Sequence, residues 1–155
     1  MEIKVIMLIN LLAYSLIVSQ SFLYIIALRN VQTSMQPASY IELRKLLDKN
    51  FQVKFRIVVY VTLLTCTVLT ILSSMHLLGL LFITSALGLV GLVLEIILAV
   101  KGNVPINRVI NSWSADQYPA NWQDYRNRWL SIFAKRQAVS ILGFLSLLVG
   151  AVFAS

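Results

Sequence analysis

Four long apolar stretches, separated by polar segments, dominate the pattern of this chain. They cover approximately residues 3–28, 57–74, 77–100 and 138–153. A helix of ~20 apolar residues crosses the hydrocarbon core of a bilayer, and these stretches approach or exceed that length. The pattern therefore predicts an all-α integral membrane protein, a four-helix bundle built from residues 1–155 as a single domain. The long polar segments, approximately 29–56 and 101–137, follow the first and third spans.

Composition supports a membrane protein and argues against nucleic-acid binding and against a membrane thiol oxidoreductase. The chain is 59% hydrophobic and 12% charged, with a mean hydropathy of +0.82, values outside the range of ordinary soluble domains. Its net charge is +7, but the basic residues flank apolar spans, so we expect a lipid bilayer and no nucleic acid as partner. Cys66 is the only cysteine, which excludes an intrachain disulfide and a CxxC redox pair.

The distribution of Lys and Arg predicts the topology. Of the 13 basic residues, all but Lys4 fall in the two long polar segments and their flanks. Basic residues are enriched on the cytoplasmic side of membrane proteins. We therefore expect both termini outside the cytoplasm, in the inner (plasma) membrane of a bacterium.

The first polar segment contains "SYIELRKLLDKNF", which predicts a short amphipathic helix at the cytoplasmic membrane surface. Ser39 followed by Glu42 is a capping-box pattern. Two interpretations remain open for its apolar stripe: it covers the end of the bundle, or it binds lipid or a partner. The stripe comprises Leu43, Leu46, Leu47 and Phe51.

Glu95 is the strongest candidate for chemistry in the spans. It shares one helical face with Thr84, Gly88 and Gly91, and small residues on such a face favour packing against another helix. A carboxylate within a span costs ~2.5–3.5 kcal/mol at the bilayer centre unless it has a partner. Glu95 is therefore either half of a buried ion pair or a base that contacts a ligand. Its candidate partners are Lys101, Arg108, Arg126 and Arg136.

The insert at 101–129 contains all three tryptophans. Gly102 predicts the end of the third helix, and Pro105 the start of a short one. A further helix is predicted to start near Pro119 or Asn121 and to continue into the fourth span without a break. We expect the insert to fold back over the cytoplasmic end of the bundle, with Glu95 holding it.

Several insert residues are candidates for a binding site. Asn103 is predicted mainly as a helix cap, whereas Asn107 is equally suited to binding a carbonyl or phenol. Trp122 and Trp129 share one helical face and are predicted to form either a membrane-interface belt or a stacking wall for a planar ligand. The only histidine, His76, lies on the opposite side, so the sequence predicts no metal site and no cofactor.

The motif N-x-P-hydrophobic-N at Asn103, Pro105 and Asn107 is followed by Trp122, Arg128, Trp129 and Arg136. This arrangement resembles the anthrone-oxygenase-like family of four-helix membrane proteins, a domain of unknown function. The specific part of the resemblance covers about 35 residues. It implies a cofactor-independent oxygenase acting on a planar phenolic substrate.

Such a reaction would place Glu95 as the catalytic base and Asn107 as a donor to the enolate oxygen. Ligand-binding residues would be Asn103, Trp122, Arg126, Trp129 and Arg136. The alternative class is a non-enzymatic accessory subunit of a larger membrane complex, whose insert docks onto a partner.

Overall fold

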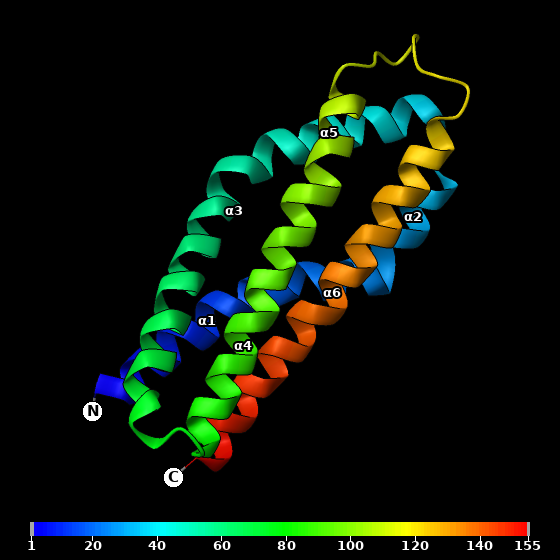
Figure 1. The fold of residues 1–155 in the computed structure, drawn as a ribbon. Coiled ribbons are helices and arrows are strands. Elements are labelled where there is room, and N and C mark those ends of the chain that lie inside the picture. Colours follow the sequence, from blue (N-terminus) through cyan, green and yellow to red (C-terminus); the bar gives the residue numbers. More distant parts are fainter. Residues whose placement is uncertain (1, 155) are drawn as a thin grey trace.

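The computed structural model describes residues 2–154, without the side chains of Glu2 and Gln52. These residues form an all-helical bundle of four columns (Figure 1). Each column contains a helix long and apolar enough to cross a membrane, as the hydropathy pattern predicted. The four candidate spans are Ile3–Ser34, Val53–His76, Leu80–Asn111 and Trp122–Phe153.

Two of the columns contain a π-helical turn between α-helices. The first column is α1 (Glu2–Leu23), the π turn η1 (Tyr24–Leu28) and α2 (Arg29–Ser34). The second is α3 (Pro37–Ser73), joined through the 3-10 turn η2 (Ser74–His76) to the third. The third is α4 (Leu80–Leu98), the π turn η3 (Ala99–Asn103) and α5 (Val104–Asn111), and the fourth is α6 (Trp122–Phe153).

All four columns are longer than the hydrocarbon core of a bilayer is thick, and three of the candidate spans have 32 residues. A span of 32 residues is ~48 Å long, whereas the hydrocarbon core is ~30 Å. Both chain termini lie at one end of the bundle (Figure 1), which we call the terminal end. Residues 24–52 and 99–137 form the opposite end, the polar end, where the columns extend beyond the length that a bilayer requires.

The predicted end of the third helix at Gly102 is wrong, because the helix continues through η3 into α5. In η3 the Val104 N–H bonds the Ala99 carbonyl, five residues back. This wider turn immediately precedes Pro105, whose ring would crowd the previous turn of a regular α-helix. Gly102 serves close packing instead: a β-carbon there would meet Ile132 Cγ2 at 2.6 Å.

The predicted capping box at Ser39 and Glu42 is also wrong. The helix begins earlier, with Pro37 in its first turn and no side-chain cap, and it continues unbroken to Ser73. Figure 1 shows α3 bending between its first part at the polar end and the part that descends along the bundle.

The face that α3 buries at the polar end differs from the predicted apolar stripe. Tyr40, Ile41 and Arg44 are buried, whereas Leu46 and Phe51 are 59% and 40% exposed. The stripe therefore does not cover the end of the bundle. At the polar end, α3 packs against α5 with the face that carries hydrogen-bonding side chains.

The insert does not fold back over the bundle, so this prediction is wrong. Instead α5 prolongs α4, and the first turns of α6 return beside it, with residues 112–121 linking the two at the far tip (Figure 1). The predicted unbroken helix from Asn121 into the fourth span is confirmed, since α6 runs from Trp122 to Phe153.

The predicted inner face of α4 is confirmed: Thr84, Gly88, Gly91 and Glu95 are all buried. A β-carbon on Gly91 would lie 2.8 Å from the Val139 carbonyl oxygen and 3.1 Å from Gly143 Cα. The backbones of α4 and α6 are therefore in contact here, as small residues allow between membrane helices.

Candidate functional site

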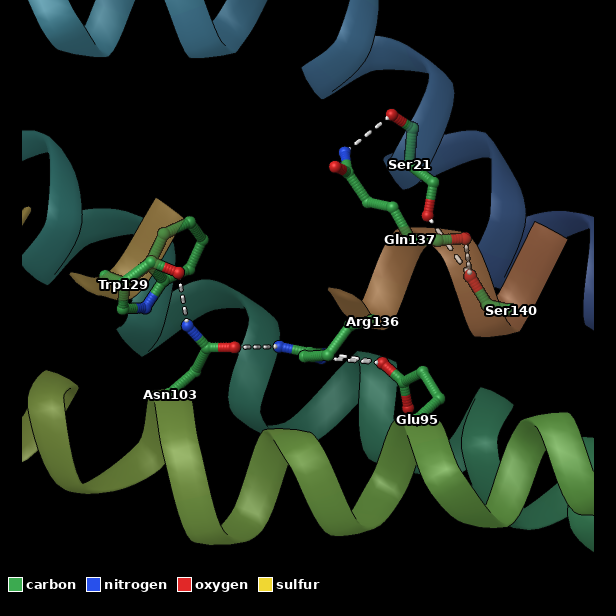
Figure 2. Close-up of polar contacts among 7 residues, drawn as sticks. All are labelled: Ser21, Glu95, Asn103, Trp129, Arg136, Gln137 and Ser140. Carbon is green, nitrogen blue, oxygen red and sulfur yellow. Dashed lines mark hydrogen bonds and ion pairs between the residues drawn. The ribbon is translucent and has the colours of Figure 1, made fainter. Parts of the chain in front are cut away.

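Glu95 belongs to a continuous polar network between α4, η3 and α6 (Figure 2). Its Oε1 accepts hydrogen bonds from Arg136 Nε at 3.0 Å and Nη2 at 2.5 Å. Arg136 Nη1 donates to Asn103 Oδ1 at 3.1 Å, and Asn103 Nδ2 donates to the Trp129 carbonyl at 2.9 Å. We call these four residues the Glu95 network.

The Glu95 network explains why a carboxylate is tolerated in α4. The Arg136 and Glu95 side chains are only 12% and 6% exposed, so the pair is buried and charge-assisted. Asn103, expected as a helix cap, makes no cap bond and bridges Arg136 to the backbone of α6. The π turn η3 places Asn103 where its amide faces α6.

A second polar contact joins α6 to α1 one turn further into the bundle. Gln137 Nε2 donates to the Ser21 carbonyl at 3.0 Å, and the Ser21 and Ser140 hydroxyls lie 3.4 Å apart (Figure 2). Ser21 of α1 thus contacts α6 through both its carbonyl and its hydroxyl.

Arg44 is the centre of a second network, which we call the Arg44 cluster. Its guanidinium carbon lies 3.8 Å from the centroid of the Trp129 ring, a distance at which cation–π attraction is effective. Arg44 also donates to Tyr24 Oη at 3.2 Å and to Asn107 Oδ1 at 2.9 Å. The cluster comprises Tyr24, Arg44, Asp48, Asn107 and Trp129.

Asn107 and Asp48 complete the Arg44 cluster. Asn107 Oδ1 accepts a further bond from Trp129 Nε1 at 2.8 Å, and its Nδ2 donates to Asp48 Oδ1 at 2.9 Å. The other Asp48 oxygen accepts from Asn111 Nδ2 at 2.7 Å. Asn107 therefore makes three hydrogen bonds to protein side chains, two of them to its Oδ1, and α3 is fixed to α5 by a carboxylate and two amides.

Aromatic rings form the apolar part of the site. Trp129 stacks on Phe133, with ring centroids 4.9 Å apart and planes at 17°. The Arg126 guanidinium lies 4.9 Å from the Trp122 ring, and Trp122 contacts Tyr40 at 5.8 Å between centroids. Each of two tryptophan rings thus has an arginine against it: Arg44 lies over Trp129, and Arg126 lies over Trp122.

Three buried polar groups beside these rings have no hydrogen-bond partner among the described residues. They are Gln32 Oε1, Tyr40 Oη and Arg44 Nε, on side chains at most 5% exposed. A buried polar group left without a partner costs ~1–3 kcal/mol. Burial also raises the pKa of Tyr40 to about 12, with the nearby Arg44 charge opposing that shift.

The sequence-predicted site residues divide into two groups in the structure. Glu95, Asn103, Asn107, Trp129 and Arg136 are joined by hydrogen bonds through the two networks. Trp122 and Arg126 instead stack on each other beside Tyr40. No group of three His, Cys, Asp or Glu side chains that could hold a metal ion occurs among residues 2–154.

Sequence reasoning missed Arg44, Asp48 and Tyr40 as site residues. They lie four residues apart along α3, and this spacing alone places them on one helical face. The leucine stripe on another face looked more in need of burial, although Leu46 and Phe51 are exposed and Leu43 and Leu47 are only half-buried.

Neither the family models, nor the curated proteins, nor the solved structures match this chain. The resemblance to the anthrone-oxygenase-like family therefore stays a prediction.

Proposed function

We propose that this protein is an integral membrane protein that binds a small planar phenolic or quinone-like molecule at its polar end, between α2, α3 and α6. The observation that supports this proposal is the gathering of three unpaired buried groups, on Gln32, Tyr40 and Arg44, beside Trp122 and Trp129. Unpaired buried groups are costly, and a ligand with matching polar atoms would offset that cost.

The unpaired groups match the edge chemistry of a quinone or phenol. Tyr40 Oη and Arg44 Nε are donors suited to a carbonyl or phenolate oxygen, and Gln32 Oε1 is an acceptor suited to a phenolic hydroxyl. The buried Trp122 and Trp129 rings supply apolar walls beside these groups, as expected of ligand sites in which a few polar groups orient a molecule.

Oxidation of the bound molecule, which the family resemblance implies, is a further step. Glu95 would remove a carbon-bound proton, and the carbanion would react with dioxygen, stabilised through Asn107 and an arginine. In the structure Glu95 Oε1 accepts two hydrogen bonds from Arg136, and three protein groups occupy Asn107. This geometry supports binding ahead of catalysis, with Glu95 as a positioning residue.

A second candidate function is an accessory subunit of a larger membrane complex. The apolar stripe of α3 at the polar end favours it, since Leu46 and Phe51 are 59% and 40% exposed. A partner helix could cover this face without any small-molecule ligand.

We further propose that the polar end lies in the cytoplasm and both termini lie outside, in a bacterial inner membrane. Twelve of the 13 basic residues belong to the polar end and its flanks, which supports this orientation through the positive-inside rule.

The binding proposal can be tested by tryptophan-fluorescence quenching with menadione, a soluble naphthoquinone, in mild detergent. Tyr40→Phe removes one hydrogen bond, so we expect roughly tenfold weaker binding. Tyr60→Phe is the matched control, because Tyr60 is on the same helix and 62% exposed; it should bind as the wild type does. Quenching that does not saturate, or equal affinity of both variants, would exclude the proposed site.

Mass spectrometry of small molecules extracted from the purified protein identifies a native ligand. Oxygen uptake with anthrone then separates binding from catalysis. If Glu95→Gln abolishes uptake while thermal stability is unchanged, Glu95 is a base; if it lowers stability and leaves menadione binding intact, Glu95 positions the helices.

A further inference from the structure

A groove of about 520 Å³ lies between α2 and α6 on the flank of the bundle, separate from the proposed quinone site. Arg29 and Thr33 of α2 line one side. Asn127, Ser131 and Lys135 of α6 line the other. These five side chains supply two cations, two hydroxyls and an amide.

The groove is electropositive. Arg29 and Lys135 are both exposed, and its eight lining residues include no Asp or Glu. An anion entering the groove would therefore meet two positive charges and hydroxyl donors without a repelling carboxylate. Such a set of groups is suited to a phosphate.

The position of the groove along the bundle distinguishes a lipid headgroup from other phosphates. Arg29 directly follows the apolar stretch 3–28, and Lys135 directly precedes the stretch 138–153. Both cations therefore lie at the boundary between the apolar and the polar parts of their columns. In a bilayer this boundary is the level of the phospholipid headgroups.

Apolar side chains continue from the groove toward the terminal end. On α6, Ala138, Leu142 and Leu145 follow Ser131 and Lys135 at alternating spacings of three and four, so they share one face. Leu142 and Leu145 are 65% and 49% exposed. On the first column, Ile26 and Phe22 lie one and two turns before Arg29 and are 76% and 48% exposed.

We propose that this groove binds the headgroup of an anionic phospholipid from the leaflet at the polar end. Arg29 and Lys135 contact the phosphate, and Asn127 and Ser131 donate hydrogen bonds to the headgroup, whereas the Thr33 hydroxyl donates to the Asn30 carbonyl at 2.9 Å. The acyl chains lie along the exposed faces below it on α1 and α6. A zwitterionic lipid offers the same phosphate but adds a cation that the two basic side chains repel.

Native mass spectrometry of the detergent-purified protein with added dioleoylphosphatidylglycerol tests this site. Each basic residue near a membrane surface contributes ~1 kcal/mol to anionic-lipid binding, so the double variant Arg29→Gln/Lys135→Gln should bind this lipid roughly thirtyfold more weakly. Arg29→Lys keeps the charge and should retain most of the affinity. Dioleoylphosphatidylcholine should bind the wild type much more weakly than the anionic lipid.

The matched control is Lys101→Gln/Arg108→Gln, which removes the same charge from exposed positions on η3 and α5, outside the groove. If the control loses as much affinity as the groove variant, the attraction is non-specific and the proposal is wrong. Displacement of the lipid by millimolar inorganic phosphate would also overturn it, because the groove would then be a site for the free ion. Circular dichroism of each variant verifies that its helices are intact.

Discussion

Glu95 shows how one residue can be both costly for insertion and stabilising after folding. Alone, a carboxylate in an apolar helix lowers the tendency of that helix to enter the bilayer. In the folded bundle it meets Arg136, whose remaining N–H group is oriented by Asn103. A buried pair contributes little compared with an apolar one, but breaking it leaves a charge without compensation.

We therefore expect Glu95→Gln to lower the free energy of unfolding by ~3 kcal/mol, because Arg136 keeps its charge and loses its counter-ion. At about 2–4 °C per kcal/mol, this corresponds to a fall of about 6–12 °C in melting temperature. Thermal unfolding in detergent, followed by circular dichroism, measures it.

Glu42→Gln provides the control, since Glu42 is exposed and its substitution should change the melting temperature little. Glu95→Gln combined with Arg136→Gln should cost less than the two single changes added together. Strictly additive losses would mean that the two side chains do not interact in solution.

Tyr40 predicts an unusual response to pH. Its hydroxyl is fully buried and unpaired, and burial raises its pKa from 10 to about 12. The folded protein thus binds this proton more tightly than the unfolded chain does. The resulting contribution to stability is complete below pH 10 and is lost as the pH rises through about 12.

Tyr40→Phe keeps the ring contact with Trp122 and removes the unpaired hydroxyl. We expect the ligand-free variant to gain ~1 kcal/mol in stability at pH 8 and to lose less stability than the wild type between pH 10 and 12. Urea titrations at several pH values compare the two proteins. Parallel losses in that range would exclude a buried, protonated Tyr40 hydroxyl.

At the scale of helices, the two π turns contact the same stretch of α6, between Trp129 and Phe133. Tyr24 at the start of η1 packs on Phe133, and Asn103 at the end of η3 bonds the Trp129 carbonyl. A π turn holds one extra residue and locally reorients the side chains around it, and such turns are frequent at functional sites. Both turns here orient a side chain of their column, Tyr24 or Asn103, toward α6.

The close approach of α4 and α6 predicts different effects for two neighbouring glycines. A β-carbon at Gly91 would collide with the backbone of α6 at Val139 and Gly143, whereas one at Gly88 would meet only the Leu147 side chain. We expect Gly91→Ala to cost ~2–3 kcal/mol, as overpacking does, and Gly88→Ala to cost clearly less because Leu147 can change its rotamer.

Chemical unfolding in detergent measures both variants under the same conditions. The proposed packing would be refuted by a Gly91→Ala protein as stable as the wild type.

The sequence predicted elements well where one property determined them. Apolar length defined the four spans, and the spacing of Thr84, Gly88 and Gly91 defined the buried face of α4. The sequence failed at Gly102 and Pro105, which usually mark a helix boundary: Gly102 lies inside the π turn η3 and Pro105 in the first turn of α5, so the column continues past both. The sequence could not show which of four basic residues pairs with Glu95, because the pairing depends on the register between α4 and α6.

At the scale of the whole molecule, the orientation in the membrane is directly testable. In a Cys66→Ala background, single cysteines at Met75 and Ser114 report on opposite ends of the bundle, and both positions are exposed. An impermeant maleimide should label Met75→Cys in intact cells and Ser114→Cys only after lysis. The reverse pattern would place the polar end outside the cytoplasm.

The order of the helices along the chain has a consequence for biosynthesis, because α6 is made after α1–α5. Gln137 and Ser21, which are bonded in the finished protein, are 116 residues apart. At about 5–20 residues per second, the ribosome makes Gln137 roughly 6–23 s after Ser21. Late in that interval, once Asn111 has been made, α1–α5 are complete but Tyr24, Arg44 and Glu95 still lack their α6 partners. Nascent chains that stall before α6 would therefore leave the Glu95 carboxylate without its Arg136 counter-ion inside an apolar helix, which is costly within a bilayer.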